Sequence, residues 1–174
     1  MRFFGLSLAL IGCIGVAASG GAQAACSLPT WSGGPVPVNQ EHVFCGEITG
    51  GTPKGYHSAT VIPPATGKTV VSISGIAPIR NGIYNATARF SNGSTKLSTF
   101  FPNACTQAQI VTSVQYAYAH NGGQGTLPWG VSGMSAPPTG GAAYCLNSVG
   151  QPLEIRMGTI GAGSSLKINT AFPR

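Results

Sequence analysis

The sequence predicts an α+β fold that is built mostly from antiparallel strands, contains few helices and is stabilised by disulfides. Three observations lead to this prediction. Short apolar runs alternate with clusters of Gly, Pro, Asn and Ser, which is typical of strands joined by tight turns. Only one segment has the signature of a helix. An even number of cysteines follows an apolar N-terminal stretch, which favours a disulfide framework.

The 174 residues divide into three predicted parts. Residues 1–24 are typical of a secretory signal peptide: Arg2 supplies the positive charge, an apolar stretch follows, and a small-x-small cleavage motif ends at Ala24. Residues 25–39 are a Pro/Gly-rich lead-in for which we expect an extended, weakly structured chain. Residues 40–174 are expected to form a single domain.

The first half of this domain is predicted to consist of strands and loops. Residues 40–48 begin the ordered part, and the composition of residues 50–55 (GGTPKG) predicts a flexible loop. Residues 68–74 (KTVVSIS) are a strand candidate. Residues 83–91 alternate apolar and polar side chains, and together with residues 95–101 beyond a glycine turn they predict a hairpin.

The second half contains the one clear helix signal. A Thr-x-x-Gln capping box begins at Thr106, and two glycines just after His120 are expected to end the helix. Residues 123–141 are rich in Gly and Pro and are predicted to be a loop. Residues 153–160 and 166–172 flank a Gly/Ser turn and predict a second hairpin.

Four cysteines remain when the leader is removed, namely Cys26, Cys45, Cys105 and Cys145. In an oxidising compartment they predict two disulfides, and three pairings are compatible with the sequence. The leader itself contains Cys13, and a lipoprotein processing site at that residue is the alternative to plain signal cleavage. The spacings do not match a structural zinc site, so we expect no metal.

The scarcity of acids narrows the chemistry. Glu41, Glu47 and Glu154 are the only carboxylate side chains, and there is no Asp. A two-carboxylate glycosidase and a carboxylate-bound Mg²⁺ or Ca²⁺ site are therefore disfavoured, and a Ser-His-Asp triad could use only Glu. The net charge is +6, and it falls by one when Arg2 leaves with the leader. Such a charge favours a polyanionic partner such as RNA.

Histidine is then the most suitable side chain for catalysis. His120 has an ordinary explanation at the helix end, whereas His42 and His57 lie fifteen positions apart. When a 2′-hydroxyl attacks its own phosphate, one group removes the hydroxyl proton and another protonates the leaving 5′-oxygen. Imidazole suits both tasks because its pKa lies near neutral pH. A nearby cation would stabilise the developing charge, and no metal is required.

The stretch EHVFCGEITGGTPKGYH, residues 41–57, resembles the two-histidine core of the EndoU-type endoribonucleases. That family includes bacterial toxin domains and the uridylate-specific endoribonuclease of coronaviruses. Residues 96–102 (KLSTFFP) and residues 168–173 (INTAFP) resemble two further segments of the bacterial members. The resemblance covers about residues 40–174 and implies an EndoU-like catalytic domain.

The resemblance also implies catalytic roles. His57 would be the general base for the 2′-hydroxyl and His42 the acid for the leaving oxygen, although the sequence also allows the reverse. Lys96 best matches the catalytic lysine beside the phosphate, with Lys54 or Lys68 as alternatives. These roles require only side chains of the protein.

Three further residues are predicted to contact the substrate. The resemblance implies that Thr170 hydrogen-bonds the base or phosphate and that Phe172 stacks against the base. Phe172 stands where viral members have Tyr, so it keeps the stacking face and lacks the hydroxyl that would support uridine preference. Gly55, next to a histidine motif, allows the backbone to approach a phosphate closely.

The resulting interpretation is an exported endoribonuclease that cleaves single-stranded RNA, at uridines, to 2′,3′-cyclic phosphate ends. We expect a monomer without a stable membrane anchor, periplasmic or secreted, that acts as a bacterial toxin with a cognate immunity protein. No cofactor is required, and nothing in the sequence supports stimulation by Mn²⁺. The alternatives are a catalytically inactive basic protein of the same fold that binds RNA or a surface, and a disulfide-stapled structural protein.

Overall fold

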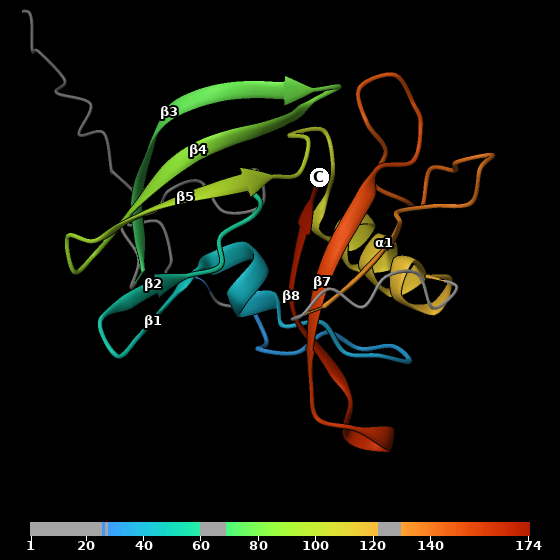
Figure 1. Ribbon diagram of the computed structural model, residues 1–174, viewed down its shortest axis with the longest axis horizontal. Helices are drawn as coiled ribbons and strands as arrows, with labels where there is room; N and C mark the ends of the chain where they lie inside the picture. Colours follow the sequence, from blue (N-terminus) through green and yellow to red (C-terminus); the bar gives the residue numbers. More distant parts are fainter. Residues whose placement is uncertain (1–25, 27, 60–68, 122–129) are drawn as a thin grey trace, which may run out of the picture.

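Two three-stranded antiparallel sheets form the framework of the computed structural model, with strand orders β3–β4–β5 and β6–β7–β8 (Figure 1). The structure describes residue 26 and residues 28–59, 69–121 and 130–174. The elements are η1 Glu41–Cys45, β1 Glu47–Thr49, β2 Thr52–Lys54, β3 Val70–Arg80, β4 Ile83–Phe90, β5 Thr95–Phe100, α1 Gln107–Ala119, β6 Val131–Met134, β7 Glu154–Ile160, η2 Gly163–Ser165 and β8 Lys167–Pro173. The predicted α+β class, mostly antiparallel with few helices, is confirmed.

The first sheet contains the predicted hairpin of β4 and β5. Its turn is closed by Asn92, whose Oδ1 accepts from the Ser94 backbone N–H at 3.1 Å, and Gly93 adopts a φ of +82°. The third strand, β3, continues to Arg80, beyond the predicted end at residue 74. The pairing of β3 with β4 contains several register shifts, which interrupt the regular pattern of the strand. The short apolar run therefore predicted only the first part of β3.

The second sheet contains the predicted C-terminal hairpin of β7 and β8. The prediction of a loop for residues 123–141 is wrong at Val131–Met134, which form the edge strand β6. Gly133 explains the strand's unusual sequence. Its Cα lies against the carbonyl of Ala117 in α1, where any side chain would collide, so glycine allows helix and strand to pack closely.

Helix α1 begins at the predicted capping box. The Thr106 backbone N–H donates to Oε1 of Gln109 at 2.8 Å, and the Gln109 backbone N–H donates to the Thr106 hydroxyl at 3.3 Å. The helix ends at Ala119, with His120 as its C-cap residue. The two glycines that were expected to end the helix, 122 and 123, lie outside the described residues.

Residues 50–55 do not form the predicted flexible loop. Thr52–Lys54 pairs with Glu47–Thr49, and the chain reverses at Gly50 and Gly51, which have φ values of +55° and +79°. Two consecutive positive φ values suit a tight hairpin turn that only residues such as glycine adopt without strain. The glycines therefore define a hairpin that leads directly to the second histidine.

The described part of the lead-in is also more ordered than its composition predicts. Val38 is completely buried and forms a bridge with Ile168 of β8, and Cys26 is disulfide-bonded to Cys45 at the end of η1. These contacts hold the segment because they bury an apolar side chain and satisfy backbone groups. The predicted signal peptide, residues 1–24, lies outside the described residues.

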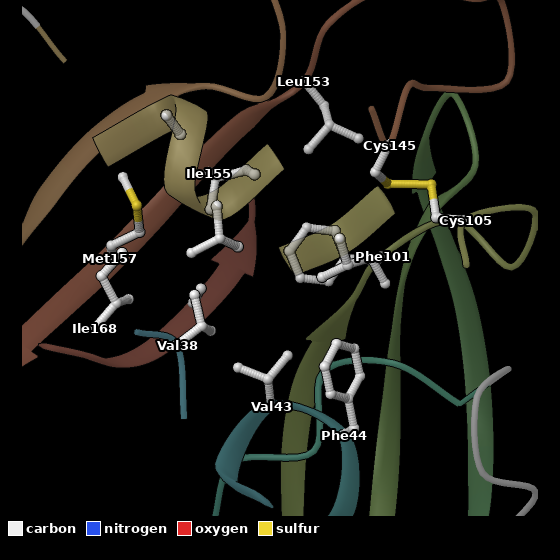
Figure 2. Packing of buried hydrophobic residues seen from close by; sticks show 14 of the residues in the cluster. Val38, Val43, Phe44, Phe101, Cys105, Cys145, Leu153, Ile155, Met157 and Ile168 are labelled. Carbon is white, nitrogen blue, oxygen red and sulfur yellow. A yellow bond between two sulfur atoms is a disulfide. The ribbon is translucent and has the colours of Figure 1, made fainter. Parts of the chain in front are cut away.

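Each sheet has its own group of buried side chains. The larger group lies among α1, η1, β7 and β8 and contains the Cys105–Cys145 disulfide (Figure 2). The smaller group lies on the β3–β4–β5 sheet around Phe90, Phe100 and Tyr56. Among the described residues, no helix is long and apolar enough to cross a membrane.

Candidate active site

A cavity of about 320 Å³ lies where β5, β8, η1 and the segment after β2 meet. All six predicted catalytic and substrate-binding residues line it: His42, Gly55, His57, Lys96, Thr170 and Phe172. The lining also includes Lys54, Leu97, Ser98 and Thr99. Residues from the first third, the middle and the end of the sequence therefore converge on one concave surface.

His42 is buried in the π-helical turn η1, where it contacts a carboxylate. Its Nδ1 lies 2.7 Å from Oε1 of Glu47, five residues further along the chain. Because a carboxylate only accepts, Nδ1 carries the proton and Nε2 is left for other chemistry. Burial lowers the pKa of His42 below its ordinary value, and the Glu47 carboxylate opposes that shift.

His57 is equally buried but bonds to the main chain. Its Nδ1 lies 2.9 Å from the carbonyl oxygen of Thr99 in β5. A carbonyl also only accepts, so Nδ1 carries the proton and the neutral ring keeps its lone pair on Nε2. Burial, with the Lys96 charge as the second cause, lowers the pKa of His57 to about 3. At neutral pH this imidazole is therefore uncharged.

The two histidine rings lie close enough to act on one phosphate. Their centroids are 6.2 Å apart and the ring planes differ by 29°. The Phe172 ring is also stacked with His57, at 5.2 Å and 24°. The three rings thus form a short series from η1 to β8. This separation is well within the roughly 10 Å that allows two groups to reach one phosphate directly or through one water.

The backbone at Gly55 and Tyr56 sets this separation. The Tyr56 N–H donates to the His42 carbonyl at 2.8 Å, and the His57 N–H donates to the Val43 carbonyl at 2.7 Å. Gly55 has a φ of +68°, and a side chain there would collide with the His42 carbonyl. Tyr56 also has a positive φ, 63°, which is uncommon for a residue with a side chain. Glycine is therefore required for the two histidine segments to lie this close.

Lys96 enters the cavity from β5. Its Nζ donates to the Ser98 hydroxyl at 2.6 Å and to the Gly55 carbonyl at 3.2 Å. The Ser98 hydroxyl also donates to the Gly55 carbonyl, at 3.3 Å. Burial lowers the pKa of Lys96 from its ordinary value. The ammonium group is thus held beside the histidines by neutral oxygen acceptors, and a phosphate could bind to it without first displacing a carboxylate.

The three candidate lysines are not equivalent. Lys96 and Lys54 both line the cavity, and each lowers the pKa of His42 by charge repulsion. The third alternative, Lys68, lies outside the described residues. Lys96 differs from Lys54 in having hydrogen bonds that fix its ammonium group next to Gly55.

Sequence reasoning missed three supporting residues. The sequence identifies Glu47 only as one of three carboxylates within a histidine motif, yet its side chain is the hydrogen-bond partner of His42. Asn39 accepts the His42 backbone N–H at 3.0 Å and donates to Asn169 in β8 at 2.9 Å. Ser98 links Lys96 to Gly55. A carboxylate five residues after a histidine was a usable signal for Glu47; the other two contacts depend on the tertiary structure.

The cysteines pair as Cys26–Cys45 and Cys105–Cys145, one of the three pairings that the sequence allowed. Two disulfides fit a protein that folds in an oxidising compartment. Within the described ranges, no group of three or more His, Cys, Asp or Glu side chains is placed to hold a metal ion. Cys45 is oxidised, so it is not available as a nucleophile.

Together the fold and the cavity define a class: an antiparallel α+β domain in which two buried imidazoles and a lysine line one cavity. The sequence model described as bacterial EndoU nuclease matches residues 38–174, and the chain belongs to that nuclease family. No curated protein and no solved structure matches the chain. The resemblance predicted from residues 41–57, 96–102 and 168–173 is thereby confirmed at the level of the family.

Proposed function

We propose that this chain is an endoribonuclease that cleaves single-stranded RNA by transphosphorylation, leaving 2′,3′-cyclic phosphate ends. The observation that carries the proposal is the asymmetry of the two imidazoles. His57 bonds to a neutral carbonyl, whereas His42 bonds to the Glu47 carboxylate, and their rings lie 6.2 Å apart. His57 is unprotonated at neutral pH, as a general base must be, and the carboxylate beside His42 stabilises the protonated form that a general acid needs.

In the proposed reaction, Nε2 of His57 takes the proton of the 2′-hydroxyl. The 2′-oxygen forms a bond to phosphorus, and the bond from phosphorus to the 5′-oxygen breaks. Nε2 of His42, in its protonated form, gives its proton to that leaving oxygen. The Glu47 carboxylate stabilises the imidazolium form of His42, and the phosphate of a bound substrate raises its pKa further.

Lys96 is the proposed electrostatic partner of the phosphate. Its ammonium stabilises the charge that develops on the non-bridging oxygens as the phosphorus becomes five-coordinate. Thr170 offers a hydroxyl at the same cavity, and Phe172 offers a ring face on which a base can stack. We propose a preference for uridine that is weaker than in members with Tyr at this position, since Phe172 has no hydroxyl to donate.

The proposed setting is outside the producing cytoplasm. A cleavable leader over residues 1–24 and two disulfides both suit export, and a nuclease that acts on other cells would require a cognate immunity protein. We propose a toxin or effector that acts as a monomer. Identifying Ala25 as the first residue of the secreted protein would support the export step, and retention of residues 1–24 would contradict it.

The direct test uses oxidised residues 25–174 and a single-stranded RNA that contains uridines. Wild type is expected to produce fragments with 2′,3′-cyclic phosphate ends, in the presence of EDTA as well as without it. His42→Ala and His57→Ala should each lose about 10²–10⁴ in rate, the range typical of general acid–base catalysis. His120→Ala is the matched control, because His120 lies at the end of α1 and bonds to Tyr116.

Two outcomes would contradict the proposal. If wild type binds the RNA and leaves it intact, the chain is the non-catalytic binding protein of the alternative interpretation. If cleavage survives loss of either histidine, the chemistry lies elsewhere.

A separate comparison of Lys96→Met with Lys54→Met identifies the lysine that contacts the phosphate. We expect the larger loss of kcat at Lys96, because its ammonium group is fixed by hydrogen bonds.

A further inference from the structure

The face of the β6–β7–β8 sheet that carries Thr170 and Phe172 extends beyond the cavity. In β7, Ile155 and Met157 are completely buried and Arg156 between them is half-buried, so Arg156 projects from the opposite face. Arg156 pairs directly with Phe172 across the sheet. Side chains in directly opposite positions share one face, with Cβ atoms about 5 Å apart. A guanidinium group therefore neighbours the proposed base-stacking ring.

The same face continues to the end of β8. Arg174 follows Phe172 by two positions, so both side chains project to the same side with Cα atoms about 7 Å apart. The Arg174 backbone N–H donates to the carbonyl of Glu154 at 3.0 Å, which keeps it in line with the sheet. Phe172, Arg156 and Arg174 thus form one row of side chains on this face, and the row begins at the catalytic cavity.

Arg174 reaches a second cavity, of about 300 Å³, which is separate from the catalytic one. Arg80, the last residue of β3, lines it from the other sheet. Asn81 and Asn147 also line it. Two arginines, one from β3 and one that follows β8, therefore line one hollow beside Arg156.

One acid lies in this region and does not cancel its charge. The Glu154 carboxylate lies 3.8 Å from Nη1 of Arg174, and both side chains are substantially exposed, at 39% and 47%. Exposed ion pairs of this kind contribute little free energy and are easily exchanged for another anion. The side chains of the three arginines and Glu154 together carry a net charge of +2, in a chain whose only other carboxylate side chains are Glu41 and Glu47.

We propose that this face is a binding track for the phosphates that flank the cleaved one. Arg156 contacts the phosphate next to the scissile group, and Arg174 with Arg80 binds a further phosphate in the second cavity. The inference rests on the proposed function, because the row begins at the cavity where that reaction would occur. Guanidinium groups suit the task since their paired N–H donors match phosphate oxygens.

The test compares substrates of two lengths. One is a uridine-containing dinucleotide, which has no flanking phosphate; the other is a ten-nucleotide strand with a single ribouridine among 2′-deoxynucleotides. For Arg80→Gln/Arg174→Gln and for Arg156→Gln, the ratio of kcat/KM on the long strand to that on the dinucleotide should fall about tenfold, equivalent to about 1.4 kcal/mol. Arg89→Gln, which removes an exposed charge from β4 of the other sheet, should leave this ratio unchanged.

A second measurement does not depend on cleavage. Binding of the fully 2′-deoxy ten-nucleotide strand is followed by fluorescence anisotropy between low and moderate salt. Each lost phosphate contact should reduce the slope of log K against log salt by about 0.7. A triple variant at Arg80, Arg156 and Arg174 loses the contacts to both flanking phosphates and should therefore lose about 1.4 from the slope.

The outcomes separate the track from the catalytic proposal. If wild type cleaves neither substrate and yet binds the strand through these arginines, the track stands and the reaction proposed above fails. If wild type cleaves both and the variants change neither the length ratio nor the salt slope, the track is wrong and the reaction stands. The second result would leave this face free for a different partner, such as an acidic protein surface.

Discussion

The segments that carry His42 and His57 are buried to the same extent but differ in what each imidazole contacts. His42 is 7% exposed and His57 is 6% exposed. The first ring bonds to a carboxylate five residues away, and the second to a main-chain carbonyl forty-two residues away. Burial alone would lower both pKa values; only His42 has a negative charge that opposes this effect.

The difference teaches how one residue type can serve two purposes. An imidazole beside a carboxylate gains protons more readily, and a buried imidazole that faces Lys96 resists protonation, because the carbonyl of Thr99 only partly opposes these two effects. Pairs of titratable groups whose surroundings shift their pKa values differently are typical of acid–base sites. Variants of the two histidines and of Glu47 test whether this difference in surroundings also makes one imidazole the acid and the other the base.

The largest expected effect separates acid from base by changing the leaving group. His57→Ala and His42→Ala should each reduce cleavage of ordinary RNA by about 10²–10⁴. A uridine 3′-(4-nitrophenyl) phosphate releases nitrophenolate, which needs no proton. On that substrate His42→Ala should recover most of its activity, whereas His57→Ala should not, because the 2′-hydroxyl still requires a base. Release of nitrophenolate is followed by absorbance.

The opposite pattern would reverse the assignment. Recovery in His57→Ala with no recovery in His42→Ala would make His57 the acid, which the sequence alone also allowed. Equal recovery in both variants would mean that neither ring has the proposed specialised role.

A smaller effect is expected from Glu47→Gln. Glutamine retains an acceptor for Nδ1 of His42 and removes the charge that opposes the effect of burial, so the pKa of His42 should fall further. In a plot of kcat against pH, the limb at which activity is lost because His42 gives up its proton should move to lower pH. Activity at neutral pH should fall about tenfold, the loss expected when a charge-assisted hydrogen bond becomes neutral.

The matched control is Glu41→Gln, which removes the neighbouring acid. Glu41 is exposed and its carboxylate accepts only a long bond from Thr30, at 3.4 Å, among the contacts of the described residues. Its pH profile should coincide with that of wild type. If Glu47→Gln lowers activity at every pH without moving the limb, Glu47 orients the ring and does not tune its charge.

The smallest effect concerns stability in acid. The pKa of His57 is about 3 in the folded protein against 6.5 as its ordinary value, so above pH 6.5 both states are neutral there. Between these values the unfolded state binds more protons, and stability must fall as the pH falls. One such group lowers the free energy of unfolding by at most about 1.4 kcal/mol per pH unit.

Few other groups contribute acid sensitivity: the sequence has only three carboxylate side chains, and His42 is the other histidine whose pKa is lowered by burial. Denaturant unfolding at pH 7 and pH 4.5 provides the measurement. His57→Asn keeps an N–H donor for the Thr99 carbonyl and cannot titrate, so its free energy of unfolding should fall less between the two pH values. An equal fall in both proteins would show that His57 is accessible to protons in the folded state.

Local sequence signals predicted much of the fold and the site residues. The capping box at Thr106 and the hairpins of β4–β5 and β7–β8 depend on neighbours in the chain, and they are correct. The prediction was wrong at β6 because Gly133, which looked like a loop residue, leaves room for the carbonyl of Ala117 in α1, and this contact cannot be recognised from the local sequence. The described part of the lead-in predicted for residues 25–39 is more ordered than its composition indicates, because the buried Val38 forms a bridge with Ile168.

The same distinction between local sequence signals and long-range contacts applies to the candidate active site. The six residues that meet at the cavity were recognisable from their motifs, each of which is a short run of sequence. The contacts that orient them were not, since Asn39 meets Asn169 and His57 meets Thr99 across long intervals. The arginine track was hidden for the same reason: its members become neighbours only through strand pairing and a shared cavity.

The bond between Asn39 and Asn169 has a consequence for when activity can arise. Asn39 holds the backbone of His42, and it is itself held by β8, which also supplies Thr170 and Phe172. A chain still being synthesised, complete only to β7, contains both histidines but has no partner for Asn39 and no wall for the cavity. The cavity is therefore complete only once β8 has paired with β7, so the proposed reaction can begin only in the fully folded chain.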